Sequence, residues 1–205
     1  MTAAVLATGA EVAADVFVLA TGPWSGKSTS YLSKGMPILI NEEQCVRVEV
    51  AKRLPPYGLT VPNGLTIFPK VGGDVIVGHV GMADLQMSFE VNLTTEEAKI
   101  MLLADAVGLL PTLCEAKLVE QRGDFEGWSP PQKRIQPILR RLPGWENIYI
   151  AARFGTLGMM MSPGGRLVMA DLIMVGGRAP ASFKNMLEVL NPADQWPDGH
   201  SQVPQ

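Results

Sequence analysis

Residues 153–165, which read RFGTLGMMMSPGG, constrain the fold more than any other part of the chain. They follow residues 147–152, whose apolar pattern predicts a buried strand. Ser162 and Pro163 are typical of the N-cap and first position of a helix, which we expect to run to about Met174 and to end at the glycine pair that follows. The segment therefore predicts a strand that passes through a glycine turn into a helix.

A turn of this kind brings the backbone close to whatever lies against it. A helix N-terminus carries roughly half a positive charge and unpaired N–H groups, so it suits an anion such as a phosphate or a reduced flavin ring. On the local pattern alone, a plain strand-to-helix connection is the alternative.

A second strand with a glycine turn lies near the start of the chain. Residues 16–20 are apolar throughout, as in a parallel strand flanked by helices, and Gly22 follows. The sequence offers too few elements to cover both faces of this strand, so we expect an uncovered apolar patch that drives self-association or pairing with a partner. Residues 26–29, which read GKST, come close to the phosphate loop GxxxxGK[ST]. The first glycine of that loop would fall at Thr21, however, and Gly35 leaves room for barely two turns of the helix that the loop needs. We therefore reject a nucleotide hydrolase.

The rest of the chain predicts short strands and one further helix. We expect a hairpin from residues 3–7 and 10–14, antiparallel strands over 36–91 and again over 116–125, a proline-rich loop at 129–137 and a disordered tail from Pro192. Thr94 with Glu97 forms a capping box for a helix over residues 95–110. We expect one apolar face of this helix to hold the side chains of Ile100, Leu103, Val107 and Leu110.

Composition excludes several functions. The net charge of −3, without a basic stripe, argues against nucleic acid as a partner. Cys45 and Cys114 form no CxxC pair, and His79 and His200 are the only histidines, so we expect no metal site and a reduced, cytoplasmic setting. The N-terminus is apolar but has no basic leader, so we expect neither a signal peptide nor a membrane span.

Three segments resemble one family in both order and spacing. Residues 14–25, ADVFVLATGPWS, are similar to the ADxVVxAxGxWS signature of the D-amino acid oxidase superfamily of FAD-dependent oxidoreductases. Residues 127–138 resemble its GxRPxxxDGxPxIG segment, and the GTLG turn at 155–158 follows at the right interval, as in glycine oxidase and in the small subunit of D-amino acid dehydrogenase. The resemblance covers residues 1 to about 190.

The resemblance implies FAD as the cofactor and oxidation of an amine or amino acid by hydride transfer to flavin N5. It implies no particular catalytic residue. By the same resemblance, the cofactor-binding residues are Thr21, Gly22, Trp24, Gly155, Thr156, Leu157, Gly158, Met159 and Met160.

The sequence departs from the family at the substrate. Ser129 stands where the family has an arginine that binds the substrate carboxylate, and serine cannot supply that charged, two-pronged hydrogen bond. Arg134 and Ile135 replace the aspartate and glycine that follow. Arg153 could take over the carboxylate, or it could be an ordinary surface or interface arginine.

No GxGxxG segment, which holds the ADP part of FAD, occurs in the sequence. We therefore expect the C-terminal half of a flavoenzyme, with α+β architecture: a mixed, largely antiparallel substrate-domain sheet with helices, plus part of a Rossmann-like FAD-binding domain. The expected domains are 1–35 and 141–190 for FAD, 36–140 for the substrate, and a tail at 191–205. A second chain could supply the GxGxxG half. The alternative function is a non-catalytic remnant or interaction subunit that keeps the fold without binding FAD.

Overall fold

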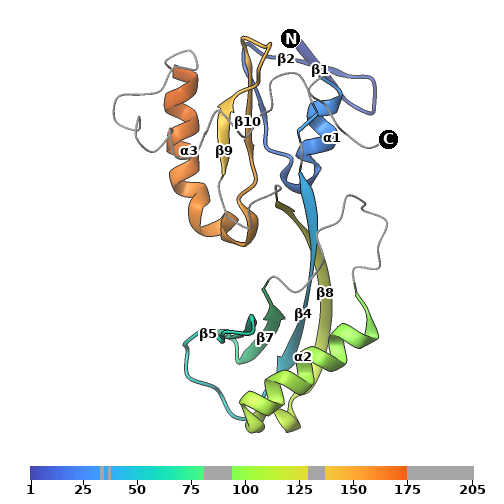
Figure 1. The fold of residues 1–205 in the computed structure, drawn as a ribbon, viewed down its shortest axis with the longest axis vertical. Helices are drawn as coiled ribbons and strands as arrows, with labels where there is room; N and C mark the ends of the chain where they lie inside the picture. Colours follow the sequence, from blue (N-terminus) through green and yellow to red (C-terminus); the bar gives the residue numbers. More distant parts are fainter. Residues whose placement is uncertain (33–34, 37, 81–93, 129–136, 175–205) are drawn as a thin grey trace. The chain divides into compact units, whose positions relative to one another are not determined.

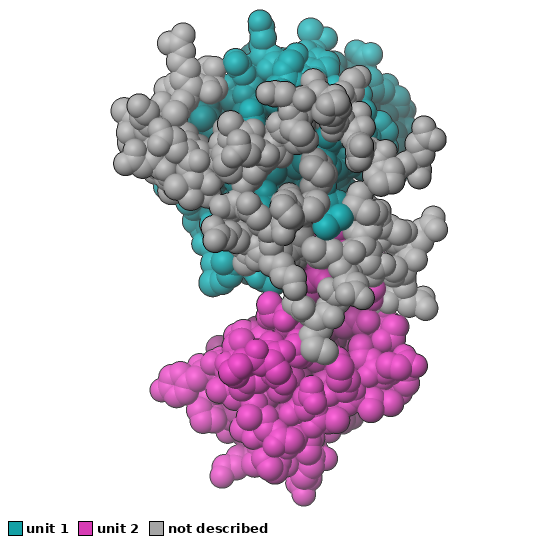
Figure 2. All heavy atoms as spheres, in the orientation of Figure 1, with its two compact units in different colours: residues 1–39, 127–205 teal, residues 40–126 magenta. Residues whose placement is uncertain are grey.

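The computed structural model describes residues 1–32, 35–36, 38–80, 94–128 and 137–174. The chain divides into two compact units, one of residues 1–39 with 127–205 and the other of residues 40–126, which Figure 2 colours separately. The predicted proline-rich loop over 129–136, the glycine pair at 176–177 and the tail from Pro192 lie outside the described residues.

The first unit is built on a three-stranded sheet in the order β3-β10-β9. Its strands are β3 (Phe17–Leu19), β9 (Ile138–Arg141) and β10 (Ile148–Ala152), and β10 runs parallel to β3 and antiparallel to β9. A separate hairpin of β1 (Ala3–Val5) and β2 (Glu11–Ala13) confirms the hairpin predicted near the N-terminus. Short helices η1 (Gly22–Trp24) and α1 (Ser25–Ser30) follow β3, while η3 (Gly155–Leu157) and α3 (Gly158–Met174) follow β10.

Both faces of this sheet are covered near β10. Helix α3 packs on one face, where Val168, Met169 and Leu172 meet Leu139 and Tyr149, and it stands beside β9 and β10 in Figure 1. A second cluster, which includes Ile150 and Ala152, packs against Met36 and Ile38. The alternation of strand side chains places these two groups on opposite faces. The strand β10 is thus the buried centre of the unit.

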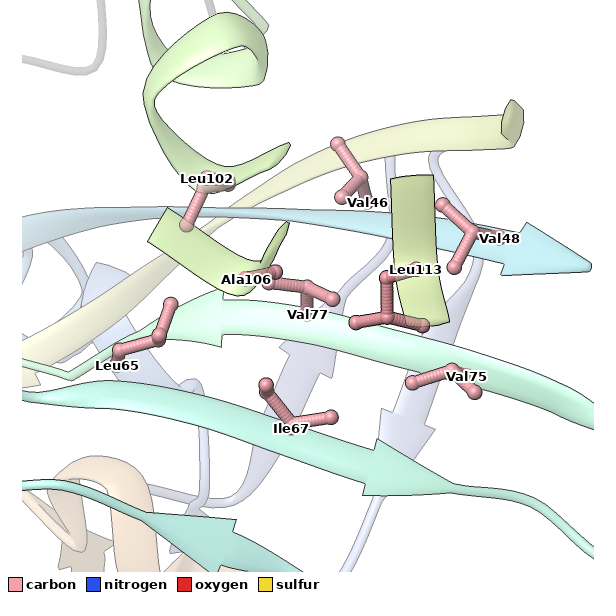
Figure 3. Close-up of a cluster of buried hydrophobic side chains, with 9 residues drawn as sticks. All are labelled: Val46, Val48, Leu65, Ile67, Val75, Val77, Leu102, Ala106 and Leu113. Atoms are coloured by element: carbon pink, nitrogen blue, oxygen red, sulfur yellow. The ribbon is translucent and has the colours of Figure 1, made fainter. Parts of the chain in front are cut away.

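The second unit is a five-stranded antiparallel sheet with one helix across it. The strands are β4 (Leu39–Glu49), β5 (Leu59–Thr60), β6 (Leu65–Pro69), β7 (Asp74–His79) and β8 (Lys117–Trp128), in the order β5-β6-β7-β4-β8. Helix α2 (Glu96–Leu109) and η2 (Pro111–Glu115) cover one face (Figure 1). Figure 3 shows the side chains that point into the layer between helix and sheet: Val46, Val48, Leu65, Ile67, Val75, Val77, Leu102, Ala106 and Leu113.

The predicted start and face of α2 are each displaced. The N-cap is Thr95, whose Oγ1 accepts a hydrogen bond from the Ala98 N–H at 3.2 Å, so the Thr94–Glu97 capping box is wrong by one residue. The helix buries Leu102 and Ala106, whereas Ile100 is exposed. The prediction favoured larger apolar residues and overlooked Ala106. The small side chain of Ala106 allows the helix to approach the sheet closely.

Two predicted strand segments are found in the structure, and one further segment also forms a strand. The passage 116–125 lies in one long strand, β8, which pairs with β4. Residues 138–140 belong to β9 and pair with β10 in the first unit. The strand at 16–20 is parallel as predicted, and Val18 is 43% exposed, so β3 is covered on only one face within the described residues. The mixed α+β fold class itself is confirmed.

The turn at Gly64 offers a test of the second unit. Gly64 has φ +94°, and a Cβ built on it would lie 2.5 Å from the Val80 carbonyl oxygen. We expect Gly64→Ala to destabilise the fold by about 2–4 kcal/mol, because both strain and overlap oppose it. Gly73→Ala, at φ +100° in open space, isolates the strain and should cost about 1–2 kcal/mol. Thermal unfolding followed by circular dichroism measures both, and equal losses would contradict the packing at Gly64.

Candidate functional site

The parallel pairing of β3 with β10 brings two distant glycine turns to one edge of a sheet. The register places Phe17 opposite Ile148 and Leu19 opposite Ile150, so both strands end at the same edge. Each strand continues into a 3-10 turn and then a helix. Ligands of α/β sheets bind at the carboxyl ends of parallel strands, which makes this edge the candidate site.

Asn147 fixes this pairing at the opposite ends of the two strands. Its carbonyl oxygen accepts a hydrogen bond from the Phe17 N–H at 2.9 Å, and its Nδ2 donates to the Asp15 carbonyl at 3.0 Å. The same Nδ2 donates to the Met1 carbonyl at 2.7 Å. One side chain therefore holds the start of β3 in register with β10.

The first turn, after β3, is closed by small polar side chains. Gly22 has φ +55°, a conformation that favours glycine, and Ser25 Oγ donates to the Gly22 carbonyl at 2.7 Å. Thr21 Oγ1 lies 3.2 Å from Ser25 Oγ. Trp24 presents a partly exposed indole in the same turn. The backbone of this turn is thus set by local hydrogen bonds.

The glycine at 127 lets the chain pass close beneath this first turn. A Cβ there would lie 3.3 Å from Pro23 Cα and 3.3 Å from a methyl carbon of Ile38. Gly127, which belongs to the family-like segment 127–138, therefore packs against the family-like segment 14–25.

The GKST sequence at 26–29 lies within α1, which has six residues. Thr29 is buried, donating to the Ser25 carbonyl and accepting from the Met36 N–H at 3.0 Å. A phosphate loop needs these residues ahead of a long helix, so the rejection of that motif holds.

The second turn, after β10, uses two left-handed residues. Arg153 has φ +64° and Gly155 has φ +51°. Gly158, by contrast, is helical, with φ −51°, and begins α3 directly after the turn. Only residues 153–157 separate the end of β10 from the start of α3.

Helix α3 begins earlier than its sequence predicts. Ser162 and Pro163 were expected to start it, but Pro163 lies inside the helix. Pro163 has no N–H to donate to the Met159 carbonyl four residues before it. Ser162 Oγ donates to that carbonyl instead, at 3.2 Å, which satisfies the acceptor. The Gly158 N–H donates to the Gly155 carbonyl, so α3 continues directly from η3 and the positive end of its dipole lies at this turn.

The residues at the start of α3 are open to a ligand. Met159 is 92% exposed and Met160 is 72% exposed. A Cβ on Gly158 would meet only Phe154 Cβ at 3.6 Å, an ordinary contact. The fold itself therefore does not require glycine at this position.

Comparison with known proteins identifies the family. A family model described as "FAD dependent oxidoreductase" matches residues 2–172. The chain belongs to this family. The curated relatives include the glycine oxidase of Pseudomonas aeruginosa, 25% identical over 92% of this chain and 47% of that protein. The glycine oxidase of Geobacillus kaustophilus is 25% identical over 81% of this chain and 42% of that protein.

Solved structures show the same fold. The glycine oxidase from Geobacillus kaustophilus superposes with a TM-score of 0.74 at 23% identity, over 85% of this chain and 45% of that one. Iminodiacetate oxidase from Chelativorans sp. BNC1 gives 0.72 at 20% identity, over 87% and 47%. The chain spans about half the length of the curated relatives it matches.

FAD is the cofactor of this family, and the two turns suit part of it. Left-handed glycines at 22 and 155 keep side chains away from the sheet edge, and the start of α3 places the positive end of a helix dipole beside it, which suits an electron-rich ring. No GxGxxG segment is present for the ADP moiety. The two turns are therefore compatible in chemistry with the flavin part of FAD.

Arg153 is the charged residue of this site. Its side chain is 4% exposed, so it is not a surface arginine, and burial lowers the pKa of its guanidinium. A left-handed backbone at a non-glycine residue costs roughly 1–2 kcal/mol, and such strain is concentrated at functional sites. Ser129, Arg134 and Ile135 lie outside the described residues.

Within the described chain, no helix has the length and apolar composition needed to cross a membrane.

Gly158 gives the sharpest test of this site. We expect Gly158→Val to leave the fold intact, because the added atoms meet no close neighbour, yet to weaken flavin binding at least about tenfold by blocking approach to the backbone. Titration of flavin fluorescence with the protein measures the affinity. Gly164→Val, on the same helix with nothing within 4 Å of its Cβ, is the matched control. Equal affinities for the two variants would remove the α3 turn from the site.

Proposed function

We propose that this chain supplies the flavin-ring and substrate-facing part of an oxidoreductase that oxidises an amine or amino acid. The observation that carries the proposal is the meeting of two glycine turns at the carboxyl ends of β3 and β10. In this proposal the first unit forms part of the FAD-binding domain and the second unit forms part of the substrate domain. The relatives named as glycine oxidase and iminodiacetate oxidase support an amine-bearing substrate.

The chemistry comes from the cofactor, and the chain provides the surroundings. FAD, when bound, would supply a hydride acceptor for the substrate carbon that bears the amine, and water would hydrolyse the oxidised product. The start of α3 at Gly158, Met159 and Met160 would stabilise negative charge on the flavin through the positive end of the helix dipole. Thr21, Gly22 and Trp24 would hold the cofactor from the other turn, while Thr156 and Leu157 connect the strand to the helix.

Arg153 is proposed to bind the substrate carboxylate. It directly follows β10 and precedes the flavin-facing turn, so its guanidinium belongs to the same edge of the sheet. Burial removes water from the guanidinium, which strengthens its attraction for an anion. Since Ser129 stands where the family has an arginine, Arg153 would provide the positive charge that is missing at that position.

The proposal predicts that the ADP moiety of FAD adds little to the affinity of the chain for the cofactor. Because the chain has no GxGxxG segment, FAD and FMN should bind the isolated chain with affinities within about threefold, and both weakly. Equilibrium dialysis with each flavin provides the comparison. FAD that binds more than about tenfold tighter than FMN would show that the ADP part has another site here. No binding of either flavin would favour the non-catalytic remnant.

A second prediction concerns the carboxylate. In a complex reconstituted with a GxGxxG-bearing half, Arg153→Met keeps side-chain volume but removes the charge. We expect it to weaken binding of glycine by about 2–5 kcal/mol while barely changing binding of methylamine, which has no carboxylate. Anaerobic bleaching of the flavin at varied substrate concentration gives both constants. An equal loss for the two substrates would mean that Arg153 acts only through packing.

A further inference from the structure

The strand β8 ends the sheet of the second unit on one side. It has 12 residues, and within the described part of the chain its only sheet neighbour is β4. The outer side of such a strand presents backbone N–H and C=O groups that can pair with another strand. Long edge strands of this kind accept an added strand unless charge or shape prevents it.

A row of alternating charges crosses the sheet and ends at this edge. Arg47 on β4 bonds to Asp74 on β7 at 2.7 Å and to Glu120 on β8 at 3.2 Å. Because Val46 and Val48 point toward α2, Arg47 and its partners lie on the opposite face of the sheet. Next along β8 on that face is Arg122, which bonds to Glu120 and is 70% exposed.

The charges of β8 favour one register for a second β8 strand. A two-fold axis requires an antiparallel pair, and an axis at Gln121 places each Glu120 opposite an Arg122. An axis at Arg122 would instead oppose the two arginines and place Glu120 against Asp124, while an axis at Glu120 would oppose the two glutamates. An axis at Gly123 would pair Arg122 with Asp124 but would also oppose Glu120 and Glu126. Of these four alignments, the charges favour the one centred on Gln121.

We propose that two copies of this chain associate through antiparallel pairing of their β8 strands, centred on Gln121. The row of Asp74, Arg47 and Glu120 then continues into Arg122 of the second copy, so the charges alternate across the junction. The same register places Val119 opposite Gly123. Because glycine has no side chain, the valine fits there without a clash. One strand pair buries little surface, so the dimer is weak and sensitive to salt.

Reversal of the two charges tests this register. Arg122→Glu places glutamates opposite each other, and Glu120→Arg places arginines opposite each other, so each variant alone should raise the dimer dissociation constant by at least about tenfold. An equimolar mixture restores Glu–Arg contacts at both positions and should recover the dimer. Lys52→Glu, at an exposed residue outside β8, makes the same change in net charge as Arg122→Glu and serves as the control for that variant.

Sedimentation equilibrium at low salt, up to about 0.5 mM chain, measures the association. If Glu120→Arg does not fold, because it also faces Arg47, concentration-dependent protection of β8 amides against hydrogen exchange in the unmodified chain replaces the mixing experiment. A chain that stays monomeric, a dimer that tolerates Arg122→Glu, a mixture of folded variants that stays monomeric, or β8 amides without concentration-dependent protection would each overturn the proposal.

Discussion

The site depends on the parallel pairing of β3 with β10. These strands lie far apart in the sequence, and no local interaction brings the turn at Gly22 to the turn at Gly155. Asn147 sets the register from one end, since its backbone and its amide side chain both bond to the residues around the start of β3. A slip of one residue would turn every side chain of β3 to the other face, so these few bonds determine what the sheet edge presents.

Backbone conformation rather than catalytic side chains characterises the edge. Gly22 and Gly155 adopt left-handed conformations, and helix α3 starts at Gly158 without an intervening loop. In the proposed site, the positive end of the α3 dipole would stabilise an electron-rich ligand without a protein charge that would need its own partner. The buried Arg153 is the exception, and its strained backbone marks the position where the chain supplies a positive charge.

The sequence predicted which strands and turns form this site better than it predicted where each element begins and ends. Strands at β3 and β10 follow from their apolar runs, and the glycines located both turns. The start of α3 was misplaced because Pro163 favours the first turn of a helix, and the hydroxyl of Ser162 that compensates for it is visible only in three dimensions. The exposure of Val18 agrees with the uncovered patch expected at this strand, because an apolar strand typical of a parallel sheet needs covering elements on both faces.

The central claim is that both turns hold one flavin together. Hydrogen exchange of backbone amides, measured with and without saturating FMN, tests it most directly because it reports on each turn separately. The account predicts slower exchange in residues 21–25 and in residues 155–161 together, with no change in β6 or β7 of the second unit. Protection of one turn without the other, or of neither while FMN is bound, would contradict it.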